Sequence, residues 1–95
     1  MAIKIDYSNV KTAIDAFEAV KKNISPEFLE EKFKVKAALD YLKDHNQIKA
    51  NGKGFNLNMK FLETHAEIDV ELAFFLKPFQ EKILSYVEHQ LKKIL

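Results

Sequence analysis

The sequence predicts an α+β fold, in which a small antiparallel β-meander carries an N-terminal helix, a middle helix and a C-terminal amphipathic helix packed on its apolar face. Near both ends of the chain, apolar residues recur every three or four positions, as on one face of a helix. Between residues 48 and 72 they alternate with polar residues, which is typical of strands with one buried face. A chain of 95 residues with 47% hydrophobic residues can bury one modest core, so we expect a single domain spanning residues 1–95.

The first two elements are a short strand and a helix. Residues 3–7 alternate apolar and charged or polar side chains, which is the period of a strand. Residues 9–23 predict an amphipathic helix, because their apolar side chains lie three and four positions apart. These apolar positions are Val10, Ala13, Ile14, Phe17 and Val20.

The next segment begins as a helix and then becomes ambiguous. Ser25 supplies a capping hydroxyl, Pro26 has a helical φ already set, and Glu27 suits the positive end of the helix dipole. Farther along, apolar residues recur at every fourth position, but apolar residues also alternate with lysines as they would in a strand. We expect a helix to about residue 44, with part-strand structure in residues 33–45 as the open alternative.

Three alternating segments predict the meander, and they comprise residues 48–51, 55–61 and 66–72. Gly52 and Gly54 mark a hairpin turn between the first two. A helix is an alternative for the third segment, because acidic residues four positions apart, beginning at Glu63, would share a helical face. As strands, the three segments form a sheet with one polar face and one apolar face.

Pro78 predicts the start of the final helix. Lys92 and Lys93 lie near its far end, where the helix dipole favours positive charge. Its apolar stripe is wide and comprises Phe79, Ile83, Leu84, Val87, Leu91, Ile94 and Leu95. We expect this stripe to cover the apolar face of the sheet.

Composition excludes several classes of function. All fifteen basic residues are lysines, and fourteen acidic residues reduce the net charge to +1. Without arginine, the chain lacks the planar group that binds phosphate or guanine in a bidentate manner. Without cysteine, it has no disulfide, thiolate nucleophile or cysteine-ligated zinc. Neither a secretory signal nor a run of eighteen apolar residues is present, so we expect a cytoplasmic protein.

Residues that commonly catalyse reactions or bind metals form no motif. His45, His65 and His89 have neither i,i+4 nor HExxH spacing, and surface positions are the simpler interpretation. The densest acidic cluster falls within residues 67–71, on the solvated face of a predicted strand. We therefore expect no enzymatic activity, no metal and no cofactor.

Charge is distributed unevenly along the chain. Residues 32–60 contain seven lysines and two acidic residues, a balance of +5, whereas each flanking segment has a balance of −2. A lysine-rich helix followed by a lysine-tipped hairpin looks like the last helix and wing of winged-helix proteins. An alternative function is therefore a DNA-binding regulator, although the absence of arginine makes nucleic acid the less favoured partner. Its candidate contacts are Lys36, Lys43, Lys49 and Lys53.

Apolar residues are densest between residues 72 and 79, in greater number than one sheet face can bury in so small a domain. Packing between the last strand and the last helix would make them part of the core. The functional interpretation is a surface that binds an apolar polymer, a hydrophobic ligand or a protein partner, including a second copy in a homodimer. The candidate contact residues are Phe74, Phe75, Phe79, Ile83 and Val87.

A longer pattern extends from Gly54 to the end of the chain. It comprises that glycine, an alternating strand, an acidic turn at Glu63, a second alternating strand, an apolar run ending in Pro78 and Phe79, and an amphipathic helix. This pattern resembles the small polyhydroxyalkanoic acid system proteins, although the chain lacks the early histidine and the central tryptophan found in that family. The resemblance implies a non-catalytic accessory protein associated with polyhydroxyalkanoate storage.

Overall fold

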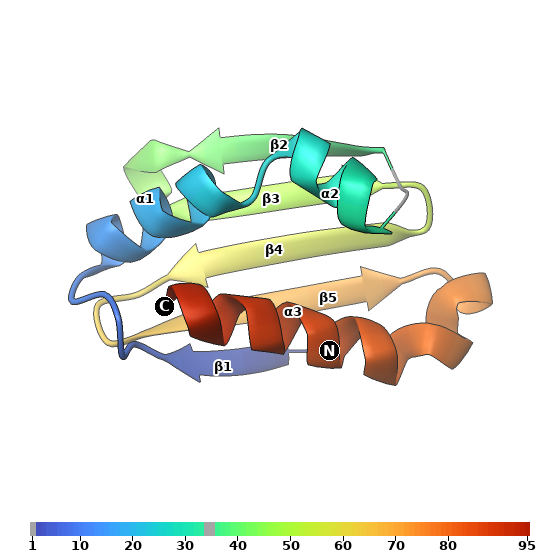
Figure 1. The fold of residues 1–95 in the computed structure, drawn as a ribbon. Helices are drawn as coiled ribbons and strands as arrows, with labels where there is room; N and C mark the ends of the chain where they lie inside the picture. Colours follow the sequence, from blue (N-terminus) through green and yellow to red (C-terminus); the bar gives the residue numbers. More distant parts are fainter. Residues whose placement is uncertain (1, 34–35) are drawn as a thin grey trace.

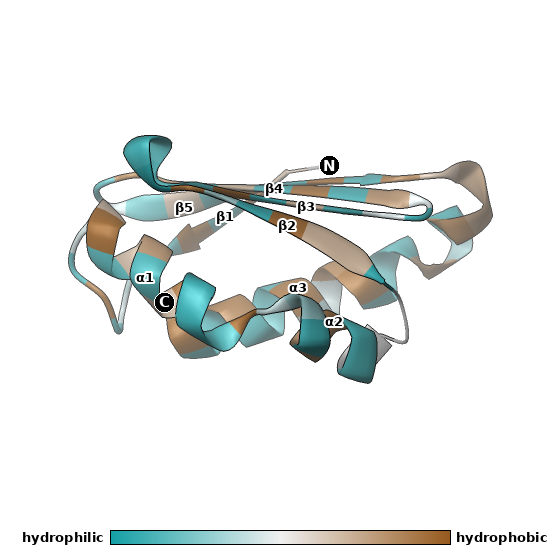
Figure 2. Ribbon diagram, turned by 90° about the horizontal axis from the view of Figure 1, so that it is seen from above, coloured by the Kyte–Doolittle hydropathy of each residue, from teal (hydrophilic) through white to brown (hydrophobic). Residues whose placement is uncertain are grey.

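The computed structural model describes residues 2–33 and 36–95, with the side chains of residues 32 and 33 excluded. Within these residues the chain forms an antiparallel sheet covered on one side by helices (Figures 1 and 2). The elements are β1 (Ala2–Asp6), α1 (Ala13–Asn23), α2 (Pro26–Phe33), β2 (Ala37–Leu42), η1 (Lys43–His45), β3 (Gln47–Gly52), β4 (Phe55–Phe61), β5 (His65–Leu72), η2 (Phe74–Phe79) and α3 (Gln80–Ile94), where η denotes a 3₁₀ helix. The predicted α+β class is confirmed.

The described part of the chain forms a five-stranded sheet in the order β1-β5-β4-β3-β2, with every neighbouring pair antiparallel. Strands β2 to β5 form the meander, and β1 adds to the free edge of β5 (Figure 1). The register aligns apolar residues across the sheet: Ile68 pairs with Ile3 on one side and Met59 on the other, and Met59 pairs with Ile48. These residues form the face beneath the helices.

The opposite face of the sheet is polar. Glu67 lies between Lys4 and Lys60, and Lys49 lies between Asp40 and Asn58. Sheet pairing therefore places two lysines of residues 32–60 beside acidic residues on neighbouring strands. Opposite charges on neighbouring strands stabilise cross-strand pairs, and here they intersperse negative charges among the lysines of the middle segment.

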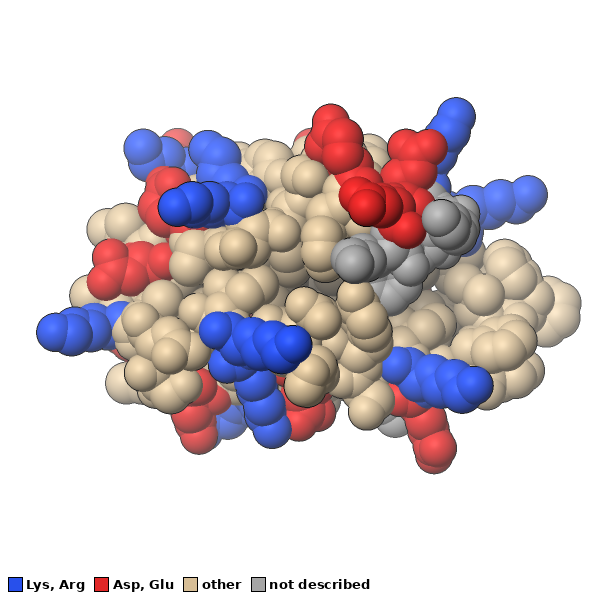
Figure 3. Space-filling model, in the orientation of Figure 1, with Lys and Arg blue, Asp and Glu red and all other residues tan. Residues whose placement is uncertain are grey.

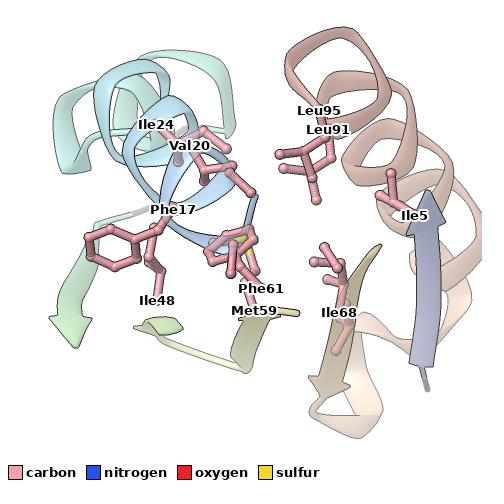
Figure 4. Close-up of a cluster of buried hydrophobic side chains, with 14 of the residues drawn as sticks. Ile5, Phe17, Val20, Ile24, Ile48, Met59, Phe61, Ile68, Leu91 and Leu95 are labelled. Atoms are coloured by element: carbon pink, nitrogen blue, oxygen red, sulfur yellow. The ribbon is translucent and has the colours of Figure 1, made fainter. Parts of the chain in front are cut away.

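The core lies between the sheet and the helices. Phe17 of α1 packs edge-on against Phe61 of β4, with ring centroids 6.3 Å apart. Leu91 and Leu95, at the end of α3, are fully buried on the side nearer β1 and β5 (Figure 4). In Figure 1, α3 crosses β5 and β1, whereas α1 and α2 cover the half of the sheet that contains β2 and β3. Two helical groups, α3 on one side and α1 with α2 on the other, thus cover the same apolar face of the sheet.

Helix α1 is shorter than predicted. It begins at Ala13 after Thr12, whose hydroxyl accepts a hydrogen bond from the Asp15 N–H (3.1 Å), and it ends at Asn23 as expected. Placing Ile14 on the apolar face was wrong, because 62% of this residue is exposed. Ala13, one position earlier, faces the core, and adjacent helical residues point about 100° apart.

The middle helix was predicted to run to about residue 44, which is wrong. Helix α2 ends at Phe33, residues 34–35 lie outside the described part, and Ala37–Leu42 form strand β2. The part-strand alternative is confirmed from Ala37 onward. Leu39 and Tyr41 alternate inward toward the core, and β2 pairs with β3 along its whole length. Backbone pairing with a neighbouring strand, which is invisible in local spacing, decides the conformation here.

The three predicted strands of the meander are confirmed, and the helical alternative for the third is wrong because this segment is β5. The final helix begins two residues later than predicted. Pro78 lies inside η2, and α3 starts at Gln80. The 3₁₀ segment Phe74–Phe79 therefore separates the last strand from the last helix.

Candidate apolar binding site

Segment η2 is held against the hairpin turn between β3 and β4. The Ala73 N–H donates a hydrogen bond to the Gly54 carbonyl oxygen (2.8 Å), and the Leu76 N–H donates to the Ala73 carbonyl oxygen (2.9 Å). Gly54 has a φ of 90°, a left-handed conformation that suits glycine. The absence of a side chain at Gly54 lets the ring of Phe75 lie directly against the turn. The turn therefore positions η2 beside the end of the sheet.

Three phenylalanines of η2 project into solvent. The exposed fraction is 83% for Phe74, 49% for Phe75 and 53% for Phe79. Phe74 and Phe75 contact each other edge-to-face, with ring centroids 6.1 Å apart. In Figure 3 the end of the molecule that carries η2, on the right, is largely free of charged side chains. Packing within the protein leaves about half or more of each ring exposed, and together we call the three rings the η2 aromatic surface.

An apolar cavity of about 250 Å³ lies next to this surface. The lining residues among the described part of the chain are all apolar: Leu29, Phe55, Leu57, Val70, Leu72, Leu76, Phe79, Ile83 and Val87. They come from α2, β4, β5, η2 and α3, so the cavity lies where the two helical groups meet the sheet. It is a tertiary feature that no single segment contains.

The five predicted contact residues fall into two groups. Phe79, Ile83 and Val87 line the cavity, whereas Phe74 and Phe75 lie outside it on η2. Sequence reasoning missed the lining residues from α2, β4 and β5. The alternation of the strands could have indicated the lining residues of β4 and β5, because they occupy inward positions. The sequence of a single strand does not show which inward side chains line a cavity and which pack against other core residues.

The four lysines of the DNA-binding alternative do not form one surface. Lys53 lies in the β3–β4 turn and Lys36 just before β2, at the same end of the sheet, whereas Lys43 lies in η1 at the other end. Lys49 occupies the open sheet face beside Asp40. The expected lysine-rich helix is strand β2 from Ala37 onward. The arrangement therefore lacks the helix-and-wing geometry on which the alternative depended.

Ionisable groups in the described residues do not converge on the cavity. Among residues 2–33 and 36–95, no three histidine, aspartate or glutamate side chains are placed to hold a metal ion. The Nε2 atom of His65 lies 3.6 Å from a carboxylate oxygen of Glu67, and its Nδ1 atom lies 2.9 Å from the Thr64 hydroxyl. These contacts lie at the opposite end of β5 from η2.

The helices within the described residues are all too short or too polar to cross a membrane.

Comparison with family models finds a match over residues 3–95 to the family described as "Putative polyhydroxyalkanoic acid system protein". No curated protein and no solved structure matches the chain significantly.

Proposed function

Because the chain belongs to this polyhydroxyalkanoic acid system protein family, we propose that it is a non-catalytic accessory protein of polyhydroxyalkanoate storage that attaches to the apolar polymer surface. The η2 aromatic surface, Phe74, Phe75 and Phe79, makes the attachment. The observation that carries this proposal is the exposure of three large apolar rings on one six-residue segment. Clustered apolar exposure of this kind marks interaction surfaces in soluble domains.

The expected strength of attachment follows from burial of the rings. Fully burying a phenylalanine side chain contributes about 1.5–3 kcal/mol, against which the cost of association must be set. The segment is already held by the Ala73–Gly54 hydrogen bond and contains Pro78, so little conformational entropy is lost when the rings are covered. Preorganisation of the three rings therefore lowers the entropic cost of attachment.

The proposal can be tested by co-sedimentation of the purified protein with polyhydroxyalkanoate particles. Phe74→Ser should lower the bound fraction several-fold, because this most exposed ring contributes to contact and not to the core. Ile14→Ser is the matched control, since Ile14 is also exposed but lies on α1. Unchanged binding by Phe74→Ser, or an equal loss in both variants, would overturn the proposal.

Self-association through the same rings would be a different function. Solution mass should be measured across a dilution series for the wild type and for Phe74→Ser. We expect the wild type to bind particles whether or not its solution mass changes on dilution. A dimer that Phe74→Ser abolishes, together with no binding of the wild type to particles, would replace surface attachment with a homodimeric role.

A further inference from the structure

The cavity is a sizeable apolar pocket that is partly open to solvent. Cores are packed about as densely as organic crystals, and an engineered apolar cavity of ~150 Å³ already accepts benzene. The cavity here measures about 250 Å³ and is surrounded by aliphatic and aromatic side chains from five elements. These side chains offer a ligand apolar contact and no hydrogen-bond partner, so the lining favours hydrocarbon in the part of a ligand that lies inside it.

Its size indicates the length of that hydrocarbon. If ~150 Å³ accommodates the six carbons of benzene, then by proportion about 250 Å³ accommodates up to roughly ten carbons. The size therefore favours a medium-length hydrocarbon chain.

A polar hollow adjoins the cavity and shares Val70 and Leu72 with it. Its other lining residues are Glu71, Lys77 and Gln80. Along β5, Glu71 alternates to the open face of the sheet, away from the side on which Val70 and Leu72 face the helices. Lys77 belongs to η2 and lines this hollow with Gln80. A ligand that extends from the cavity into the hollow would thus come near the ammonium group of Lys77.

We propose that the cavity binds the hydrocarbon chain of a medium-chain fatty acid of roughly eight to ten carbons, with its carboxylate beside Lys77. This inference does not rest on attachment to a polymer surface. Hydrocarbon burial supplies most of the affinity, because the ammonium of Lys77 is exposed and its attraction to a carboxylate is screened. The positive charge of Lys77 selects a carboxylate as the head group.

Isothermal titration calorimetry with fatty acid salts of increasing chain length tests the proposal, with each salt kept below its micelle concentration. We expect saturable one-to-one binding with an optimum near eight to ten carbons. Val87→Trp, which places a larger ring in the cavity, should weaken octanoate binding at least ten-fold, whereas Ile14→Trp on the exposed face of α1 should not. Ile83→Phe is a second, smaller filling variant, and circular dichroism of each variant checks that it folds.

A second comparison tests the head group. Octanoate should bind more tightly than octylammonium, and Lys77→Gln should reduce that preference, whereas Lys93→Gln, at the far end of α3, should preserve it. Tighter binding of octylammonium would overturn the assignment of the carboxylate to Lys77. Absent binding, or binding that strengthens steadily with chain length and is unaffected by Val87→Trp, would overturn the cavity site.

The two proposals fail separately. Phe74→Ser alters the η2 aromatic surface but not the cavity lining, so octanoate binding should persist while particle binding falls. Val87→Trp should show the reverse pattern. Loss of both activities in both folded variants would contradict the assignment of two distinct sites.

Discussion

The ring of Phe75 lies against Gly54, at a distance that leaves no room for a side chain on the glycine. A Cβ built at Gly54 would lie 2.6 Å from the Cζ atom of Phe75 and 3.0 Å from the Cδ1 atom of Leu76. The same glycine accepts the hydrogen bond from the Ala73 N–H and has a φ of 90°. One residue of a hairpin turn therefore sets the position of η2, which carries the exposed rings and part of the cavity wall.

Gly54→Ala should destabilise the protein by about 1–3 kcal/mol, because alanine is strained at positive φ and its Cβ meets the Phe75 ring. Urea denaturation measures the loss. Lys53→Ala, in the same turn but exposed, should have little effect. Phe75→Ala should offset part of the cost of Gly54→Ala, and the absence of any coupling between the two changes would contradict the contact.

Phe17→Ala should reduce the free energy of unfolding by about 3–5 kcal/mol, because the ring is fully buried and contacts Phe61. Ile14→Ala in the same helix removes a side chain that is mainly in solvent and should cost far less. Thermal or urea denaturation of both variants provides the comparison. Similar losses in the two variants would show that α1 is rotated relative to the sheet.

Tyr41→Phe should cost about 1 kcal/mol, since it removes the hydrogen bond that the Tyr41 hydroxyl donates to the Ile24 carbonyl oxygen (3.1 Å) and retains the ring. This bond joins β2 to the junction between α1 and α2. Native-state hydrogen exchange should therefore show faster exchange in β2 of the variant than in β5. An unchanged stability would indicate that water replaces the lost partner.

The stability of the protein should fall as the pH rises from about 10 to about 12. Burial, with a smaller contribution from the charge of Glu63, raises the pKa of Tyr7 to about 12, and the Tyr7 hydroxyl donates to the Leu62 carbonyl oxygen (2.6 Å). The fold favours the neutral phenol, so this stabilisation is complete below the unfolded pKa of about 10 and is lost as the pH approaches the folded value.

Comparison of the wild type with Tyr7→Phe isolates this effect from the titration of the lysines. Denaturation at several pH values should show a smaller loss of stability in the variant across this range. Glu63→Gln should lower the pKa of Tyr7 when phenolate absorbance is followed. Ionisation of Tyr7 close to pH 10 in the folded wild type would refute the prediction.

The spacing of apolar residues was sufficient to predict the secondary structure wherever only one conformation matched it. The alternation of residues 66–72 yields the inward residues of β5, and the spacing of Phe17 and Val20 yields the buried face of α1. It was insufficient between residues 37 and 42, where helical and strand periods overlap. Pairing of Leu39 with Ala50 and of Tyr41 with Ile48 decides in favour of a strand, and these partners lie on the next strand, outside the segment itself.

For the candidate site too, the sequence predicted some features and the tertiary structure decided others. The run of phenylalanines in η2 is evident in the sequence, but their exposure depends on the turn at Gly54 and on the late start of α3. The setting of the predicted lysines also depends on the tertiary structure. Sheet pairing sets Lys49 beside Asp40 and Lys60 beside Glu67, so charge concentrated along the sequence is interleaved in space.

The sequence by itself determined the α+β class, the meander and the family. Hydrophobic periodicity and the order of turns can be recognised along the sequence without knowing which elements pack together. Only the tertiary structure decided that Ala37–Leu42 is an edge strand, that Phe74 points into solvent, and that side chains of α2, β4, β5, η2 and α3 line one cavity. The physical reason is that strand pairing, burial and cavity volume are set by contacts between distant segments, which a period along one segment cannot encode.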